Sequence, residues 1–475
     1  MSQNKKHIHV IGICGVATSA LAIAFHKKGW TVSGSDKGFY PPVSTALENA
    51  GIPFYAGWHP EKMISTEMGG VLDFVVAGGS GTSASNPELT YAREHAIPVL
   101  AFAEALGKFF IKKNSIVTVG TWGKTTTSAI LSYILLQADM KPSYFTGGLS
   151  LSHDTGELSD SDWSVVEGDE YQTAIWDKKP KFAYYSPTHL LLTSVSWDHA
   201  DLYPTEQAYF DEFKNLIARI PANGLIVSCA DNAGIKKIIG AAKCKVVTYG
   251  KDGADYSYHN VFPTKKGIYF KIDKKSTGET FSIESPMLGR FNVENIAGCF
   301  AMASEIGIAP VKIISAIASF RGIKRRLEKR FEGEVTLLDG HAPTAEKAQS
   351  ILESVREVYD KKIITIFEPN IGGRQRESIV KYDNAFTNAD VVIIPRLTKL
   401  KIAAESTTGS TPEKPLEGNE LVDYISKTHK NVTYIEDDSK LVEKIISEAK
   451  DGDVIAFLGS HGFRGMIEET IAKLK

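Results

Sequence analysis

Short apolar segments that end in glycine or in a polar residue alternate with helical segments from the start of the chain. The stretch HIHVIGICG (residues 7–15) is typical of a buried strand that ends in a glycine turn. Residues 16–29 have the pattern of a helix, and WTVSGSD (residues 30–36) is typical of the next strand. Such alternation is the pattern of a doubly wound parallel sheet, so we predict an α/β fold.

Three α/β segments follow one another along the chain, and we predict three domains. The first covers residues 1–112 and the third covers residues 329–475, and the alternation of strands and helices predicts that both are Rossmann-like. The second covers residues 113–328 and begins with a strand, a glycine-containing loop and a helix, which favours a P-loop ATPase type of domain. A chain of 475 residues is too long for a single core, so several domains are expected.

The overall charge gives no sign of a nucleic-acid or membrane partner. Lysine and arginine number 54 and aspartate and glutamate 56, which gives a net charge of −2, so any bound anion must be held by local groups. No segment reaches the roughly 18 apolar residues in a row that a membrane span needs. The four cysteines are scattered without the spacing of a zinc site or a redox pair. We therefore expect a cytoplasmic protein with no nucleic-acid and no membrane partner.

The turn after the first strand carries Gly12 and Gly15, and the second strand ends in Asp36. Glycines at such a turn let the backbone approach a pyrophosphate at a helix N-terminus, which attracts anions. The third glycine of the dinucleotide fingerprint is absent, because residue 17 is alanine. The turn is therefore either a pyrophosphate site or a tight connection without a ligand.

The segment VTVGTWGKTTTSAI places Gly120, Gly123, Lys124 and Thr125 between an apolar strand and a helix. Backbone N–H groups in such a loop bind phosphates, the lysine reaches the terminal phosphate, and the threonine hydroxyl binds Mg²⁺. An exposed turn that happens to contain Gly-Lys-Thr is the alternative. The strand–loop–helix context favours the first interpretation, with ATP and Mg²⁺ as the cofactors.

Two further strands of the second domain end in residues that bind metal ions. VVEGDE supplies Glu167, and SVSWDHADLY supplies Asp198, His199 and Asp201. Because the carboxyl ends of parallel strands lie on one edge of a sheet, we expect these side chains to converge on Lys124. A Mg²⁺ ion that is held by a hydroxyl and by phosphates still needs a carboxylate. Solvated acidic loops and a structural histidine are the alternative.

The order of these motifs resembles the Mur ligase family. The segments that carry the resemblance are GTWGKTTT, VVEGDEYQTAIWDKKPKFAYYSP, WDHADLYP, FNVENIAG and FRGIKRRLE. The similarity runs through most of the chain, and the succession of motifs is more specific than any one of them. The family consists of ATP-dependent enzymes that build the peptide stem of peptidoglycan, so the resemblance implies a ligase that forms a C–N bond with ATP and Mg²⁺.

The resemblance implies a role for each residue that matches a family motif. Lys124, Glu167 and His199 match catalytic positions, and Thr125, Glu167 and His199 match metal-binding positions. The positions that it places at the nucleotide are Gly120, Thr121, Gly123, Lys124, Thr125, Thr126, Asn292, Asn295, Arg326 and His341. The positions that it assigns to a UDP-sugar in the first domain are Gly12, Gly15, Ser35 and Asp36.

Some segments are most similar to one branch of the family. They are GICG, GSDKGFYPPVSTALENAGI and EGDEYQTAIWDKKPKFAYY. That branch joins the amine of L-alanyl-γ-D-glutamyl-meso-diaminopimelate to the lactyl carboxylate of UDP-N-acetylmuramate through an acyl phosphate, in peptidoglycan recycling. The implied partners are therefore UDP-N-acetylmuramate and an amino-acid or peptide amine. The family's usual residues are replaced by Trp122, Phe291, Ala342, Asn370 and His461, and because most of these lie in the third domain they leave the amine open.

Three alternatives remain at this point. The first is a ligase that adds L-alanine to the same nucleotide sugar. The second is a polyglutamate-type amide ligase in which Arg374 and Arg376 clamp an acidic peptide, although arginines on a polar loop are more often solvated. The third is a nucleotide-binding regulatory protein that has lost ligation, against which the retained Lys124, Glu167 and His199 argue.

Overall fold

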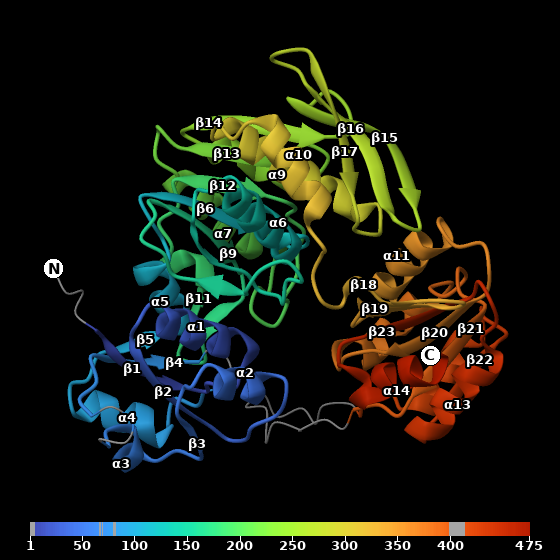
Figure 1. Cartoon of the computed structure of the whole chain (residues 1–475), viewed down its shortest axis with the longest axis horizontal. Helices are drawn as coiled ribbons and strands as arrows, with labels where there is room; N and C mark the ends of the chain where they lie inside the picture. The colour runs from blue at the N-terminus through green and yellow to red at the C-terminus, as the bar shows by residue number, and fades with distance from the viewer. Residues whose placement is uncertain (1–4, 66–67, 69, 79–81, 399–413) are drawn as a thin grey trace. The chain divides into compact units, whose positions relative to one another are not determined.

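The computed structural model describes residues 5–65, 68, 70–78, 82–398 and 414–475 and groups the chain into two compact units. The first unit holds the chain up to Asn260 together with Phe270–Glu284 and Val293–Arg321. The second holds Val261–Tyr269, Ser285–Asn292 and Gly322–Lys475. Figure 1 shows both units and labels most of their helices and strands.

The N-terminal part of the first unit is a five-stranded parallel sheet in the order β3-β2-β1-β4-β5. Its strands are β1 (His7–Ile11), β2 (Thr31–Asp36), β3 (Phe54–Ala56), β4 (Phe74–Ala77) and β5 (Val99–Ala101). Its helices are α1 (Val16–Lys27), α2 (Val43–Asn49), α3 (Pro60–Met63), α4 (Pro87–Glu94) and α5 (Phe102–Phe109). Strand β1 is central and all its residues are buried, which explains its continuous apolar character. The predicted Rossmann-like arrangement is confirmed here.

The rest of the first unit is built on a ten-stranded sheet in the order β17-β16-β15-β14-β13-β12-β6-β9-β7-β8. Residues 261–269, at the turn between β15 and β16, are grouped with the second unit. The strands are β6 (Asn114–Val119), β7 (Ser143–Phe145), β8 (Gly156–Glu157), β9 (Trp163–Gly168), β12 (His189–Leu192), β13 (Leu225–Cys229), β14 (Lys245–Gly250), β15 (Tyr256–Thr264), β16 (Gly267–Lys274) and β17 (Glu279–Ser285). The helices are α6 (Lys124–Gln137), α7 (Glu206–Arg219), α8 (Ala233–Ile238), α9 (Phe291–Glu305) and α10 (Pro310–Ser319). Strands β14, β13, β12, β6, β9 and β7 pair in parallel, so the carboxyl ends of β6, β9 and β12 share one edge.

A short antiparallel hairpin joins the two sheets of the first unit. It consists of β10 (Gln172–Ala174) and β11 (Asp177–Pro180) and leads into the 3₁₀ helix η2 (Lys181–Tyr184). Trp176 at its tip packs against the apolar cluster of the N-terminal sheet, with the Arg93 guanidinium 5.4 Å from its ring centroid. Phe145 of the central sheet meets Phe102 edge-on at a centroid distance of 5.4 Å. These contacts explain why both sheets belong to one compact unit.

The second unit contains a six-stranded sheet in the order β18-β19-β23-β20-β21-β22. Only β18 is antiparallel to its neighbour among the pairs of this sheet that the described residues form. The strands are β18 (Arg326–Glu332), β19 (Thr336–His341), β20 (Ile363–Glu368), β21 (Val391–Pro395), β22 (Val432–Ile435) and β23 (Val454–Gly459). The helices are α11 (Ala345–Arg356), α12 (Gly418–Ile425), α13 (Asp438–Glu448) and α14 (Met466–Leu474).

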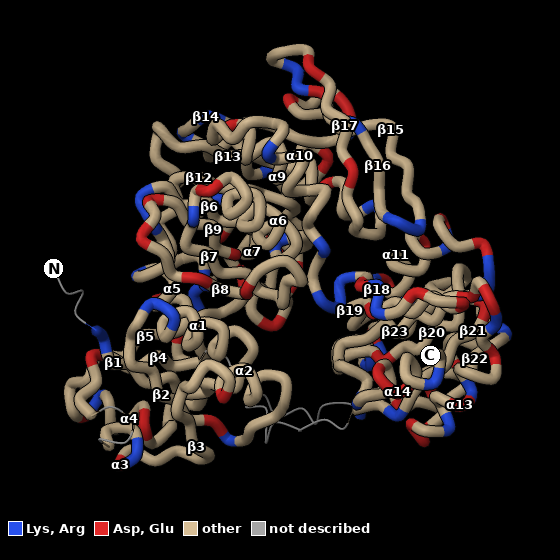
Figure 2. The backbone as a smooth tube through the Cα atoms, viewed as in Figure 1, with Lys and Arg blue, Asp and Glu red and all other residues tan. Residues whose placement is uncertain are grey.

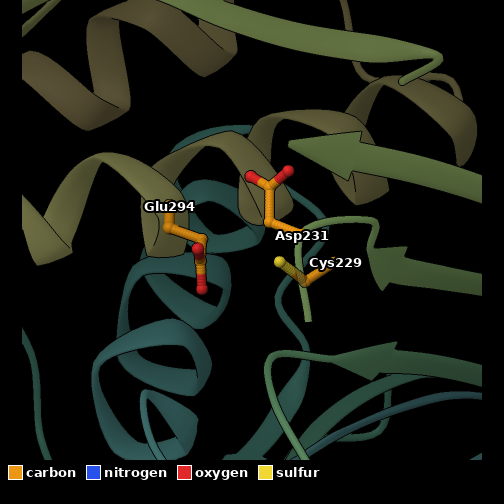
Figure 3. A group of neighbouring side chains, drawn as sticks. All are labelled: Cys229, Asp231 and Glu294. Atoms are coloured by element: carbon orange, nitrogen blue, oxygen red, sulfur yellow. The ribbon is translucent and has the colours of Figure 1, made fainter. Parts of the chain in front are cut away.

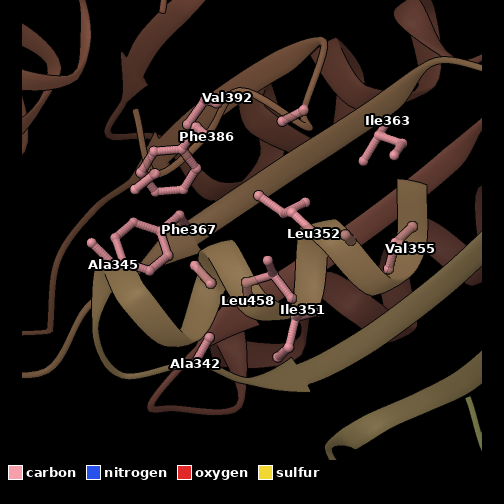
Figure 4. Packing of buried hydrophobic residues seen from close by; sticks show 14 of the residues in the cluster. Ala342, Ala345, Ile351, Leu352, Val355, Ile363, Phe367, Phe386, Val392 and Leu458 are labelled. Carbon is pink, nitrogen blue, oxygen red and sulfur yellow. The ribbon is translucent and has the colours of Figure 1, made fainter. Parts of the chain in front are cut away.

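The core of the second unit has two apolar clusters because alternate strand residues face opposite sides of the sheet. Ile363 and Phe367 of β20 pack with Leu352 of α11, as Figure 4 shows. Ile364 and Ile366 of the same strand pack in the other cluster, with residues of α13 and α14. The predicted α/β architecture of three domains is confirmed, since the chain forms three large sheets and each of them is mainly parallel.

The charged residues of the two units are mixed in sign. Figure 2 shows lysines and arginines interspersed with aspartates and glutamates along the described backbone. None of the helices that the structure describes is both long and apolar enough to span a membrane.

A buried polar network lies inside the N-terminal sheet. The carboxylate of Glu88, which is completely buried, accepts hydrogen bonds from the Ser35 hydroxyl at 2.5 Å, the Tyr55 hydroxyl at 2.6 Å and the backbone N–H of His59 at 2.8 Å. The His9 ring nitrogen Nε2 lies 3.6 Å from the same carboxylate. Burial raises the pKa of Glu88, but the hydrogen bonds from His9, Ser35 and Tyr55 outweigh it and lower this pKa overall. Burial lowers the pKa of His9.

We expect the Glu88→Ala substitution to lower the free energy of unfolding by about 3 kcal/mol, because three donors, two of them buried, would lose their acceptor. Urea unfolding followed by tryptophan fluorescence measures this, since Trp30 and Trp58 lie in the same part of the chain. Glu94→Ala, at the exposed end of the same helix α4, is the matched control and should change the unfolding midpoint little. Equal effects of the two substitutions would contradict the expectation.

The same network predicts that the protein loses stability in acid. The pKa of His9 is lower in the folded state than its ordinary 6.5, so the unfolded chain binds the proton first as the pH falls below that value. Glu88 adds a further loss below its ordinary 4.5, because its folded-state pKa is also lowered. The stabilisation from both groups is therefore present at neutral pH, and urea midpoints measured between pH 7 and pH 4 should fall.

Candidate functional site

The loop between β6 and α6 is shaped by two glycines. Gly120 has φ 143°, and a Cβ atom on it would lie 2.2 Å from the Thr193 hydroxyl oxygen. Gly123 has φ 85°, and its Cβ would lie 2.4 Å from the Asn295 side-chain oxygen. No side chain fits at either position, so the sequence Gly-x-x-Gly is required for the loop to pass between β12 and α9. The predicted strand–loop–helix context of this motif is present.

The middle of the loop is fastened to the segment that follows β12. The Thr121 hydroxyl donates to the Ser196 carbonyl at 2.9 Å, and the Trp122 N–H donates to the Ser194 hydroxyl at 2.9 Å. The side chain of Thr121 therefore holds the loop in place. The predicted Thr126 is buried in the first turn of α6. The Trp122 ring is 51% exposed.

Lys124 is the cation of this site. Its ammonium group donates to the Gly120 carbonyl at 2.6 Å and lies 2.8 Å from Oε2 of Glu170, which is only 1% exposed. Burial lowers the pKa of Lys124, but the carboxylates of Glu170, Asp169 and Glu167 outweigh burial and raise it overall. The group is therefore a fixed positive charge at the start of α6, where phosphate oxygens would also meet the helix N–H groups.

Glu167 and Thr125 form the part of the site that fits a divalent cation. The Thr125 hydroxyl donates to Oε1 of Glu167 at 3.0 Å, and the Gly147 N–H donates to Oε2 at 2.6 Å. Burial raises the pKa of Glu167, because a carboxylate in this position lacks water. A hydroxyl and a carboxylate oxygen are the hard ligands that Mg²⁺ takes, so these two side chains fit the predicted metal.

His199 also lies near Glu170. Its Nε2 is 3.8 Å from Oε1 of Glu170, and its ring meets the edge of Tyr171 at a centroid distance of 4.9 Å. The backbone of His199 has φ 54°, an uncommon value that the tight turn after β12 imposes. The structure therefore brings the predicted Lys124 and His199 to one carboxylate. Glu170 itself was not predicted, although it stands three residues after Glu167.

The remaining predicted nucleotide residues are divided between the two units. Asn295 accepts a hydrogen bond from the Thr127 hydroxyl at 3.3 Å, which places it beside the phosphate loop. Asn292 donates from Nδ2 to the Leu288 carbonyl at 2.7 Å. Arg326 begins β18 and His341 ends β19 in the second unit, where burial and the charges of nearby arginines lower the pKa of His341 to about 4.

A cavity of about 390 Å³ lies at the carboxyl edge of the N-terminal sheet. The residues that line it are Gly12, Gly15, Val16, Ala17, Thr18, Asp36, Lys37, Trp58, Gly78, Thr82, Phe102 and Lys181. Asp36 fixes the glycine turn by accepting from the Cys14 N–H at 2.8 Å. The structure thus gathers the predicted Gly12, Gly15 and Asp36. It does not bring the Ser35 hydroxyl to the cavity, because that group donates to the buried Glu88. Trp58 and Lys181 were not predicted.

Three metal-ligating side chains meet at a second place in the first unit. Figure 3 shows Cys229, Asp231 and Glu294 together, and their ligand atoms lie within 4.8 Å of one another. Burial raises the pKa of the Cys229 thiol to about 12 and also raises the pKa of Glu294. The thiol is therefore protonated at neutral pH, and metal binding would first require removal of that proton. We assign no metal to this cluster.

The second unit has a cavity of about 230 Å³ at the start of α11. Its lining residues are Thr344, Ala345, Glu346, Gly372, Gly373, Ser378, Lys381 and Tyr382. Arg374 is directed elsewhere: it is 5% exposed, and its Nε donates to the Leu416 carbonyl at 2.9 Å. The idea that Arg374 clamps an acidic peptide is therefore wrong, because its guanidinium is used inside the fold.

The contact between Lys124 and Glu170 predicts that the carboxylate competes with a bound nucleotide. We expect Glu170→Gln to tighten ADP binding about threefold to tenfold when no divalent cation is present, because phosphate would no longer have to displace a charged partner. Isothermal titration calorimetry measures this directly. Glu206→Gln, on the exposed face of α7, is the control and should leave ADP affinity unchanged. Weaker binding by the Glu170 variant would contradict the expectation.

Comparison with known proteins identifies three family domains in the chain. Residues 7–114 match the Mur ligase family catalytic domain, residues 117–303 the Mur ligase middle domain, and residues 325–461 the Mur ligase glutamate ligase domain. The chain is 31% identical to the UDP-N-acetylmuramate–L-alanine ligase of Desulfosudis oleivorans over 461 residues, which cover 96% of this chain and 95% of the relative.

A second relative acts on a peptide. The chain is 27% identical, over 99% of both chains, to the UDP-N-acetylmuramate–L-alanyl-γ-D-glutamyl-meso-2,6-diaminoheptandioate ligase of Haemophilus influenzae. Among solved structures, the UDP-N-acetylmuramate–alanine ligase of Thermotoga maritima superposes with a TM-score of 0.77 at 22% identity, over 98% of both chains. The murein peptide ligase of Psychrobacter arcticus gives 0.69 at 23% identity, over 99% of this chain and 98% of the other. The chain therefore belongs to the Mur ligase family, whose members are ATP-dependent ligases that form amide bonds in peptidoglycan synthesis.

Proposed function

We propose that this protein joins an amine to the lactyl carboxylate of UDP-N-acetylmuramate, with ATP as the source of energy. The observation that carries the proposal is that one compact unit holds both a phosphate loop with Lys124 and a separate cavity at the Gly12–Gly15 turn. The loop suits the triphosphate of ATP, and the cavity suits the diphosphate of a nucleotide sugar. The N-terminus of α1 attracts the anionic groups of that diphosphate. Both substrates would be met in the cytoplasm.

The reaction that fits these sites has two steps. In the first, a carboxylate oxygen of the acceptor attacks the γ-phosphorus of ATP, the bond from that phosphorus to the β–γ bridging oxygen breaks, and ADP leaves. In the second, the nitrogen of a deprotonated amine attacks the carbonyl carbon of the acyl phosphate. The bond from this carbon to the phosphate oxygen breaks, phosphate leaves with the electron pair, and the nitrogen loses its extra proton as the amide forms.

The residues of the site act by binding and by neutralising charge. Phosphoryl transfer needs little covalent chemistry from a protein, so positioning and electrostatic stabilisation carry it. Lys124 and the N–H groups at the start of α6 would bind the terminal phosphates. Thr125, Glu167 and His199 would hold Mg²⁺, which when bound supplies positive charge to the phosphate oxygens.

The amine that we propose first is that of the tripeptide L-alanyl-γ-D-glutamyl-meso-diaminopimelate. Its support comes from the segments 12–15, 34–52 and 167–185, which resemble the tripeptide-ligating branch, and from a match over 99% of both chains with the Haemophilus influenzae relative. L-Alanine is the second candidate, and the 31% identity to the Desulfosudis oleivorans relative favours it.

We expect Lys124→Ala to lower the rate of amide formation at least a hundredfold, because the terminal phosphates would lose their fixed positive charge. Release of phosphate from ATP in the presence of acceptor and amine measures the effect. Lys141→Ala, which removes an exposed lysine beyond the same helix, is the control. Near-normal turnover by the Lys124 variant would contradict the assigned role.

A parallel assay decides between the two amines. With UDP-N-acetylmuramate and ATP held constant, we expect phosphate release to be faster with the tripeptide than with L-alanine at equal concentration. Mass spectrometry of the nucleotide-sugar product confirms which amide has formed. Faster turnover with L-alanine would transfer the proposal to the second candidate, and no amine-dependent turnover at all would favour a nucleotide-binding protein without ligase activity.

A further inference from the structure

Lys181 is the residue of the central segment that reaches the cavity of the N-terminal sheet. The glycine turn, the first turn of α1 and the end of β2 form the other walls, all from the N-terminal part of the chain. Lys181 comes instead from the first residue of η2, which follows the β10–β11 hairpin. Its side chain is 19% exposed, so its ammonium group is partly withdrawn from water.

Two contacts connect Lys181 with the phosphoryl-transfer site. Its ammonium group lies 2.5 Å from Oδ2 of Asp169, two residues after Glu167, and 5.7 Å from the ring centroid of Tyr171. The Tyr171 ring also contacts His199, at a centroid distance of 4.9 Å. Burial raises the pKa of Asp169, but the charges of Lys181 and then Lys124 outweigh burial and lower this pKa overall, so both lysines act on the same carboxylate.

An acceptor that is bound in the cavity of the N-terminal sheet and reacts at the phosphate loop must bring its reacting carboxylate past Lys181 and Asp169. Its diphosphate would bind at the N-terminus of α1, beside the Gly12–Gly15 turn. Its carboxylate must then approach the phosphate that binds at Lys124. We propose that Lys181 binds the reacting carboxylate of the nucleotide-sugar acceptor and directs it toward the phosphate loop. The inference rests on the proposed function and assigns a residue to the acceptor.

The chemistry of an ammonium group suits this task. It has three N–H donors, and one of them donates to Asp169, so others can donate to a second carboxylate. The positive charge offsets the repulsion between the acceptor carboxylate and the triphosphate as the two anions approach. Asp169 acts through Lys181 as a positioning residue, because its ion pair holds the ammonium group at the wall of the cavity.

Binding of two nucleotide sugars tests the assignment. UDP-N-acetylmuramate carries the lactyl carboxylate, whereas UDP-N-acetylglucosamine has the same diphosphate without it. We expect Lys181→Ala to weaken the binding of UDP-N-acetylmuramate about tenfold or more and to change that of UDP-N-acetylglucosamine less than threefold. Lys181→Arg should restore most of the difference because it keeps the charge. Calorimetric titration of the wild type and of both variants with each nucleotide sugar gives the six affinities.

Lys178→Ala is the matched control, because Lys178 is exposed on the same hairpin and its ammonium group contacts only the Gln172 side chain among the interactions found for the described residues. It should bind both nucleotide sugars as the wild type does. ADP affinity should be unchanged in Lys181→Ala, which shows that the phosphate loop has remained folded. In turnover, the same variant should lower kcat/KM for the acceptor while the KM for ATP stays within threefold.

The outcomes separate this inference from the proposed function. If the wild type binds UDP-N-acetylmuramate and Lys181→Ala binds it equally well, only the role of Lys181 is overturned. An equal loss for both nucleotide sugars would also overturn it, because the lysine would then hold the diphosphate. If the wild type binds neither nucleotide sugar, the proposed function fails and the inference fails with it. A loss confined to UDP-N-acetylmuramate supports both.

Discussion

The burial of the Lys124 ammonium group among three carboxylates is the interaction on which the first unit depends. A buried cation is tolerated only when it is paired, and here Glu170 contacts it directly while Glu167 and Asp169 act at longer range. All three carboxylates stand at or just beyond the end of β9, and Lys124 follows the end of the neighbouring strand β6. Parallel pairing of these strands therefore creates the site, because it brings both ends to one edge of the sheet.

The loop before Lys124 owes its shape to its neighbours as much as to its own glycines. Thr193 after β12 and Asn295 in α9 fill the space that side chains at Gly120 and Gly123 would need. The strand–loop–helix arrangement of this segment could be predicted from the sequence, because few structures fit Gly-x-x-Gly-Lys between an apolar strand and a helix. The position of Glu167 beside Thr125 could also be predicted, since the end of a buried strand limits where its side chain can be.

Side-chain direction beyond the strand ends could not be predicted in the same way. Ser35 is buried although it stands beside Asp36, because β2 has parallel neighbours on both sides and its residues are covered on both faces. Arg374 points into the fold because its side chain donates to the Leu416 carbonyl. Leu416 is distant in the sequence, so no local pattern predicts this contact. Lys181 lines the cavity because the β10–β11 hairpin before it packs on the N-terminal sheet. Glu170 contacts Lys124 because β9 ends at Gly168, two residues before it. Each of these depends on tertiary contacts that a linear motif does not contain.

The charges of the site fit the binding of a divalent cation together with anionic substrates. Lys124 and Lys181 supply two positive charges, and Glu167, Asp169 and Glu170 supply up to three negative ones, so these five described side chains together carry no excess of positive charge. Burial raises the pKa of both Glu167 and Glu170, which means that each is ionised only at a cost. A bound cation would remove that cost and would supply the charge that the anionic substrates need.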